Sequence, residues 1–235
     1  MENVKREFLG RYTAPDVAGA KREFARREEI LNSLTHGIGA IFGIVGLFML
    51  LMKVSGGGAI RVFSALFYGL SLIILYSASA IYHAVSAAYG KKTKSRAVEL
   101  FMKCDHSMIF LLILGTYTPV CLVGLGGGIG IGIFLFVFPL CALGIVLNII
   151  DVRRFKRVSI FMNLLTGWTI TVAFYPFYLA VGERGINYLV LGGILYTVGV
   201  AFYKRPDVRN MHTVWHLFVL GGSIMHFILI YSYCL

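Results

Sequence analysis

Two histidines four residues apart open the last apolar run of the chain. His212 and His216 stand in the segment HTVWH, and a helix places residues with this spacing on one face, about one turn apart. Such a pair offers two imidazole nitrogens to one metal ion. Because residues 217–235 are nearly all apolar, the pair lies at the mouth of a membrane span, where polar side chains are costly and usually functional. Two interfacial histidines at a helix end are the alternative interpretation.

The composition is that of a membrane protein. Of 235 residues, 58% are hydrophobic and 14% are charged, whereas a soluble domain is about half apolar and a quarter charged. The formal net charge of +11 falls in short loops between apolar runs, so it indicates membrane topology and attraction to anionic lipid head groups rather than a nucleic-acid partner.

Seven apolar runs follow a basic N-terminal arm at residues 1–30, whose last part, Lys21–Glu29, could form a short interfacial helix. Each run is close to the ~20 residues that cross ~30 Å of hydrocarbon. The sequence therefore predicts an all-α, polytopic membrane protein in which residues 31–235 form one seven-transmembrane helix bundle. The predicted spans are residues 33–53, 61–88, 103–123, 129–150, 158–180, 186–203 and 212–234.

The distribution of lysine and arginine predicts the orientation. Of the 22 such residues, all but Lys53, Arg61 and Arg184 lie in the arm or in loops on the same side of the predicted spans. Cytoplasmic loops carry the excess of positive charge, so we expect the N-terminus in the cytoplasm and, with seven spans, the C-terminus outside.

This topology places five of the six histidines in the cytoplasmic leaflet. His226 is the exception, because it lies ten residues beyond His216 and therefore about 15 Å deeper along a helix. A common site explains the clustering better than five unrelated positions do. The five are His36, His83, His106, His212 and His216.

Three imidazoles from two helices, with one position left open, are typical of a catalytic zinc site. Zinc activates a water molecule and polarises a carbonyl, and a nearby carboxylate must take the proton of that water. Asp105 is the only acidic residue within the seven predicted spans, and Ser79 lies one turn before His83, where its hydroxyl could hold the water or an oxyanion.

Each of these residues has a simpler interpretation. Asp105 could pair with Lys103 or Lys92, and a serine such as Ser79 commonly serves helix packing in membranes. His106 points roughly 100° away from Asp105 on the same helix, so the two are not expected to face one cavity, and we interpret His106 as interfacial.

Four motifs resemble the bacterial hemolysin III family, a branch of the progestin and adipoQ receptor (PAQR) superfamily. They are LNSLTHGIGA, SASAIYH, KCDHSMIFLLILGTYTP and HTVWHLFVLGGSIMHF, in the first, second, third and seventh predicted spans. The resemblance implies seven transmembrane helices, a cytoplasmic N-terminus and zinc in the inner leaflet. By position in the motifs, it assigns zinc binding to His83, His212 and His216, the family's serine to Ser79 and its water-binding aspartate to Asp105.

The resemblance also implies a function. Zinc-dependent amide hydrolysis is proposed for ceramide-like lipids in the receptor branch, so we expect a plasma-membrane hydrolase of a lipid amide or ester, with membrane lipids as its partners. Two alternatives remain. One is a pore-forming hemolysin, although no predicted span has a polar stripe that would line a wide channel. The other is a receptor or regulator of membrane homeostasis with structural zinc, although structural sites usually fill all four positions with protein ligands.

Overall fold

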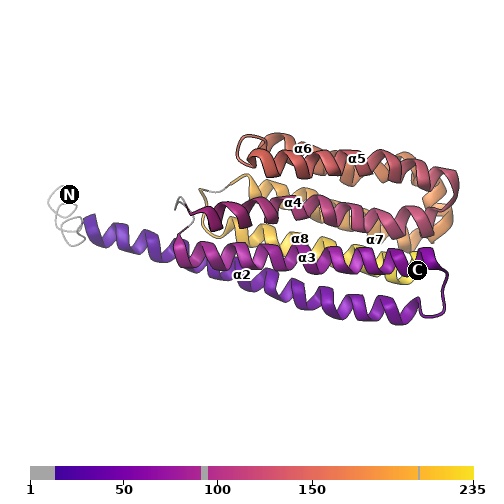
Figure 1. Cartoon of the computed structure of the whole chain (residues 1–235), viewed down its shortest axis with the longest axis horizontal. Helices are drawn as coiled ribbons and strands as arrows, with labels where there is room; N and C mark the ends of the chain where they lie inside the picture. The colour runs from indigo at the N-terminus through magenta and orange to yellow at the C-terminus, as the bar shows by residue number, and fades with distance from the viewer. Residues whose placement is uncertain (1–13, 91–94, 206) are drawn as a thin grey trace, which may run out of the picture.

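The computed structural model describes residues 14–90, 95–205 and 207–235, and they fold into a bundle of long helices lying side by side (Figure 1). The beginning of α2 and the C-terminus lie at opposite ends of the bundle. The long helices are α2 (Ala14–Lys53), α3 (Ala59–Tyr89), α4 (Arg96–Pro119), α5 (Gly127–Asp151), α6 (Lys156–Trp168), α7 (Phe174–Tyr203) and α8 (Met211–Leu229). Three short helices, η1 (Val120–Leu125), η2 (Thr169–Ala173) and η3 (Ile230–Cys234), continue α4, α6 and α8.

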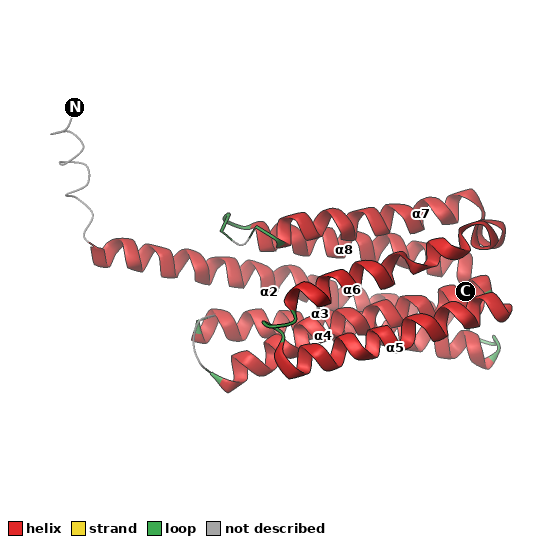
Figure 2. Cartoon of the chain, turned by 90° about the horizontal axis from the view of Figure 1, so that it is seen from above, coloured by secondary structure: helices red, strands yellow, loops and turns green. Residues whose placement is uncertain are grey.

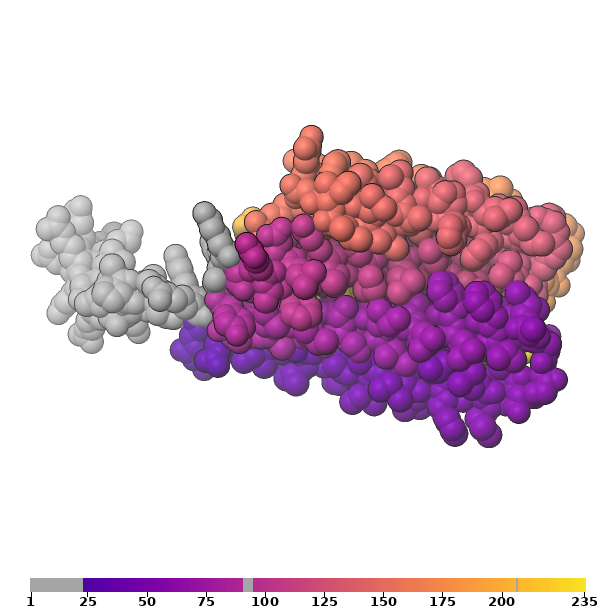
Figure 3. Space-filling model, viewed as in Figure 1, coloured from indigo at the N-terminus to yellow at the C-terminus, as the bar shows by residue number. Residues whose placement is uncertain are grey.

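The bundle is apolar outside and partly polar inside. On α2, for example, Ile41 and Phe48 are 63% and 65% exposed, while Asn32 and His36 are 0% and 2% exposed. Such an arrangement is unfavourable in water but suits a hydrocarbon solvent, in which helices satisfy their own backbone hydrogen bonds and polar side chains turn inward. Figure 3 shows the helices packed into one elongated body on the face that it views. The membrane prediction is confirmed: the chain is an all-helical, multi-pass membrane protein.

Among the described residues, six helical stretches are long and apolar enough to cross a membrane, whereas the sequence predicts seven runs. The numbers differ because the fifth and sixth predicted runs lie in one stretch of 48 residues, Lys156–Tyr203. This stretch bends sharply at Gly182, whose φ of 70° and ψ of 179° are open essentially to glycine alone. The Trp168 indole donates a hydrogen bond to Thr197 Oγ1 across the bend, at 3.0 Å. Figure 2 shows α6 running to one end of the bundle and α7 returning from it.

α2 is continuous through the predicted boundary at residue 30. The part of the arm from Ala14 onward, including the stretch expected as a short separate helix, belongs to the same 40-residue helix as the first span; residues 1–13 lie outside the described residues. Glu29, assigned to the arm from the sequence, is only 6% exposed. A second acidic side chain besides Asp105 is therefore buried in this helical bundle.

Candidate metal centre

His83 of α3 and His212 and His216 of α8 come together inside the bundle. One ligand nitrogen from each lies within 4.8 Å of the other two, and the three ring centroids are 4.8 to 5.1 Å apart. His83 and His216 are fully buried. The Nε2 atoms of His83 and His216 are buried and have no hydrogen-bond partner among the described residues. Buried polar atoms are normally paired, so these two nitrogens, with a third imidazole beside them, suit a metal ion held between the three rings.

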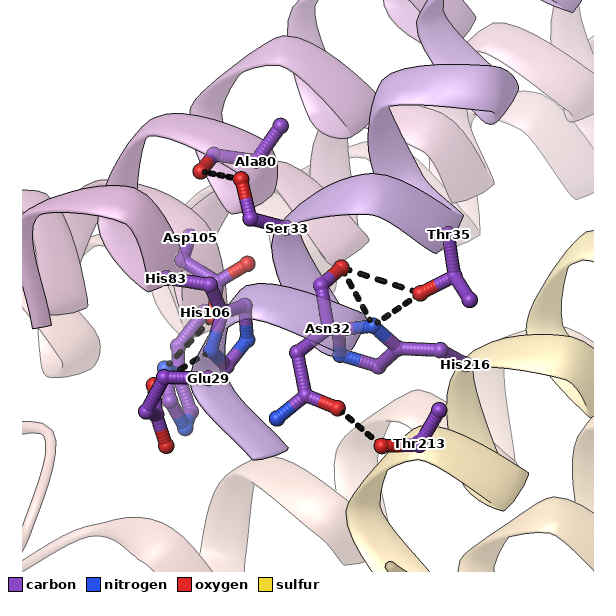
Figure 4. A network of polar contacts seen from close by, with 10 residues as sticks. All are labelled: Glu29, Asn32, Ser33, Thr35, Ala80, His83, Asp105, His106, Thr213 and His216. Atoms are coloured by element: carbon purple, nitrogen blue, oxygen red, sulfur yellow. Dashed lines mark hydrogen bonds and ion pairs between the residues drawn. The ribbon is translucent and has the colours of Figure 1, made fainter. Parts of the chain in front are cut away.

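The opposite ring nitrogens of His83 and His216 are held by α2. His83 Nδ1 lies 2.8 Å from Glu29 Oε2, and His216 Nδ1 lies 3.2 Å from both the Asn32 carbonyl oxygen and Thr35 Oγ1 (Figure 4). A carbonyl oxygen only accepts hydrogen bonds, so the His216 Nδ1 carries the proton and its Nε2 keeps a lone pair. The Glu29 carboxylate has the same effect on His83. Both rings are thus held in the tautomer that a metal ion requires.

These contacts make the trio suitable for zinc. Three imidazoles match the protein ligand set of some catalytic zinc sites, and a second layer of carboxylate and carbonyl acceptors commonly orients such ligands. The sequence predicted these three residues as ligands by resemblance, and the structure brings all three together.

The supporting residues on α2 were missed by the sequence analysis. Glu29, Asn32 and His36 are spaced by three and four residues in EEILNSLTH, which puts them on one helix face. A polar stripe of this kind on an otherwise apolar helix is a detectable signal. His36 completes the stripe: its ring stacks on His216 with centroids 3.5 Å apart and meets the Tyr76 ring edge-on at 5.0 Å.

Asp105 and Ser79 are both buried, at 5% and 1% exposure. Asp105 lines a cavity beside the histidine cluster and lies 3.6 Å from His106 Nδ1. Two lysines were suggested as ion-pair partners of Asp105. Lys103 pairs with Glu99 instead, with Nζ 3.2 Å from Glu99 Oε1, and Lys92 lies outside the described residues. Ser79 Oγ is buried with no hydrogen-bond partner among the described residues, so its hydroxyl is available to a ligand.

The expectation that His106 and Asp105 do not face one cavity is wrong. His106 lines the same cavity as Asp105, with Nδ1 3.0 Å from the Met102 carbonyl oxygen and Nε2 3.2 Å from Tyr203 Oη. A rotation of 100° does not separate the two side chains because the cavity, bounded by several helices, covers more than one face of α4. His226 also lines this cavity, where its Nε2 lies 3.2 Å from the Leu189 carbonyl oxygen.

The cavity is mostly apolar and extends along the helices that bound it. It has a volume of about 160 Å³ and is bounded mainly by α4, α6, α7 and α8. Asp105, His106, Lys156 and Tyr203 lie at one end, and Trp168 and His226 lie toward the other. His36 joins the cavity to the cluster, because it lines the cavity and stacks on His216. Tyr203, which lines the Asp105 end, has its ring centroid 5.9 Å from that of His212, so this end lies one side chain away from the cluster.

Comparison with known proteins gives consistent matches over nearly the whole chain. A family model described as "Haemolysin-III related" matches residues 24–227, which include the α2 stripe and all three cluster histidines. "Hemolysin-3" of Bacillus cereus is 40% identical over 89% of this chain and 93% of its own length, and the "Hemolysin-3 homolog" of Bacillus subtilis (strain 168) is 38% identical over 90% and 96%. The human "Monocyte to macrophage differentiation factor" is 28% identical over 88% of this chain and 84% of its own length.

We expect purified protein to contain about one zinc ion per chain, because three imidazoles with one open position hold a single ion. Replacing His83 and His212 together by alanine should remove the ion, as measured by elemental analysis. His226→Ala is the matched control and should keep it, since His226 contacts the Leu189 carbonyl oxygen and lies outside the cluster. Full zinc content in the double variant would contradict the assignment.

The contact between Glu29 and His83 predicts that Glu29 supports metal binding without being a ligand. Glu29→Ala should weaken zinc affinity about 10- to 100-fold, the usual cost of losing an acceptor that orients a ligating histidine. Competition with a graded set of chelators measures the change. Glu23→Ala, which removes an exposed carboxylate paired with Arg27, should leave the affinity unchanged; equal losses in both variants would show a general effect of charge instead.

Proposed function

Since this chain belongs to the haemolysin III-related family, within the progestin and adipoQ receptor superfamily of membrane proteins, we propose that it is a zinc-dependent hydrolase of a lipid amide or ester. The observation that carries the proposal is the geometry of the site. Three imidazole rings whose ligand nitrogens lie within 4.8 Å of one another stand beside a mostly apolar cavity, and the Asp105 carboxylate lies at the same end of that cavity. A hydrolase of lipids needs this combination of an electrophilic metal, a proton acceptor and a chain-shaped cavity.

Bound zinc would polarise the substrate carbonyl and make a water molecule a better nucleophile. The chain's own residues perform the remaining tasks. Asp105 takes the proton of the attacking water and then delivers it to the leaving group, as a general base and acid. The Ser79 hydroxyl donates a hydrogen bond to the water or to the oxyanion that forms on the carbonyl. Glu29, Asn32 and Thr35 keep the imidazole rings oriented through their contacts at 2.8 to 3.2 Å.

The cavity supports a lipid substrate. Most of its lining is contributed by apolar side chains and ring faces, and its long axis follows the helices. A substrate that enters sideways from the bilayer would place its chain in this cavity and its amide or ester group at the Asp105 end. Burial of the reacting group excludes bulk water and strengthens the electrostatic contacts around it.

The topology we propose has seven crossings, with the N-terminus in the cytoplasm and the C-terminus outside. The 48-residue stretch Lys156–Tyr203 would be about 72 Å long as one straight helix, which is more than twice the ~30 Å of hydrocarbon. The bend at Gly182 and the contact between Trp168 and Thr197 across it support two antiparallel crossings. Seven crossings also agree with the beginning of α2 and the C-terminus lying at opposite ends of the bundle (Figure 1).

Reporter fusions test this topology. A reporter that is active only outside the cytoplasm should be active when fused after Leu235 and inactive when fused in the loop after α5, where Arg153 and Arg154 lie. The reason is the preference of basic loops for the cytoplasmic side. A reporter fused after Leu235 and active only in the cytoplasm would mean that the stretch Lys156–Tyr203 does not cross twice.

Asp105→Asn separates an enzyme from a protein with structural zinc. The amide is nearly isosteric but cannot accept a proton, so lipid turnover should fall by about 10²- to 10⁴-fold, the usual contribution of a general base. Zinc content should stay near that of the unaltered protein because Asp105 lies outside the histidine cluster. Mass spectrometry of lipids incubated with the purified protein measures turnover.

The same variant tests the alternative suggested by the names of the two Bacillus relatives. Dye leakage from vesicles reports pore formation. If the protein is an Asp105-dependent hydrolase, Asp105→Asn should lower lipid turnover without changing dye leakage. Undiminished lipid turnover in Asp105→Asn would exclude the hydrolytic mechanism proposed here. Structural zinc predicts a different result: the unaltered protein would show no lipid turnover, and Asp105→Asn would change the zinc affinity and the thermal stability.

A further inference from the structure

Three helices line the cavity with stripes of nearly equal length. The lining residues recur at intervals of mostly three and four, from Asp105 to Tyr117 on α4, from Lys156 to Trp168 on α6 and from Tyr203 back to Gly193 on α7. At a rise of 1.5 Å per residue, these stripes are about 18, 18 and 15 Å long. The cavity therefore runs parallel to the helices and is about as deep as one leaflet, which is half of the ~30 Å hydrocarbon core.

The deep end of the cavity is formed by side chains whose polar atoms contact other parts of the protein. The Tyr117 hydroxyl donates to the Thr166 carbonyl oxygen at 2.7 Å. The Trp168 indole N–H donates to Thr197 Oγ1 at 3.0 Å, and His226 Nε2 lies 3.2 Å from the Leu189 carbonyl oxygen. These rings are left with mainly apolar faces and edges to offer a ligand. Such a surface fits the methyl end of a hydrocarbon chain better than a polar group.

Trp168 occupies the position that ends the stripe on α6. The α-helix stops at Trp168 and the tighter helix η2 begins at Thr169, so the periodic lining does not continue along this segment. The indole lies against Gly193 of α7: a Cβ atom built on Gly193 would be 3.1 Å from Trp168 Cη2 and Cζ2. The absence of a side chain at residue 193 thus leaves room for the indole between α6 and α7.

We propose that Trp168 forms the floor of the cavity and sets the longest hydrocarbon chain that the site accepts. This inference rests on the proposed lipid function, and it identifies the ligand class as a lipid with a hydrocarbon chain no longer than one leaflet is deep. The three stripes and the ring at their deep end define a cavity whose length, set by Trp168, limits the chain that it can hold. Trp168 acts here as a specificity-determining residue, remote from Asp105 and the histidines.

The test uses saturated fatty acids, the acyl products that hydrolysis of a lipid amide or ester would release. Their lengths are graded from about 8 to about 20 carbons, which brackets the chains of one leaflet. Binding to the full-length protein in detergent is measured by displacement of a fluorescent fatty acid. While the chain still lengthens into the cavity, each added CH₂ should tighten binding about fourfold, the equivalent of ~0.8 kcal/mol. Beyond the length at which the chain meets Trp168, this gain should stop.

In Trp168→Ala the fourfold gain should continue for about two or three further carbons, because the indole no longer blocks the chain. Two controls separate this effect from general disturbance. Thr197→Val removes the acceptor of the indole hydrogen bond but keeps the indole, and Leu165→Ala trims an exposed side chain of the same helix; both should keep the original limit. Should Trp168→Ala fold poorly, Trp168→Leu provides a smaller truncation with the same expected direction.

The outcomes distinguish this inference from the proposed function. If chains bind but the limit is the same in Trp168→Ala and the unaltered protein, Trp168 is not the floor, and the hydrolase proposal is unaffected. If the limit moves while lipid turnover is absent, Trp168 sets the chain length as inferred and the hydrolase proposal fails. If fatty acids of every length fail to bind, the inference is overturned.

Discussion

The structure depends on the contacts that α2 makes with two buried imidazole rings. Glu29 holds His83 Nδ1 at 2.8 Å, and the Asn32 carbonyl oxygen holds His216 Nδ1 at 3.2 Å. In a low-dielectric interior an unpaired polar atom is costly, so these contacts determine which nitrogen of each ring remains free. Contacts from α2 thereby reach both α3 and α8 at one point, where His83 and His216 lie close together (Figure 4).

Further polar contacts around this centre bring the same three helices together. Ser33 donates to the Ala80 carbonyl oxygen at 2.9 Å, joining α2 to α3, and Thr213 donates to Asn32 Oδ1 at 2.6 Å, joining α8 to α2. Association of membrane helices gains little from apolar burial, because lipid tails are as apolar as the side chains they replace. Interhelical hydrogen bonds and close packing must supply that stability, so the residues that build the site also hold the bundle together.

Close packing is visible where α7 meets α8. A Cβ atom on Gly192 would lie 2.3 Å from the His226 ring, so only glycine allows α7 to approach α8 this closely. This approach also brings Tyr203 to the site, where its ring centroid lies 5.9 Å from that of His212 and its hydroxyl lies 3.2 Å from His106 Nε2. The cavity end that holds Asp105 therefore depends on helix packing more than 10 residues away along α7, a distance of about 15 Å.

The amino-acid sequence alone determined the all-helical membrane class, because the length and composition of each apolar run specify a membrane helix without reference to the rest of the fold. It also identified His212 and His216 as a pair, since their four-residue spacing has one outcome on a helix, while the family motifs supplied His83. Only the tertiary structure decided that Glu29 supports His83, that His106 shares a cavity with Asp105, and that Lys156–Tyr203 bends back at Gly182. Those facts depend on how helices distant in sequence are placed against one another. Periodicity within a single helix specifies which residues share a face, but not which neighbouring helix that face will meet.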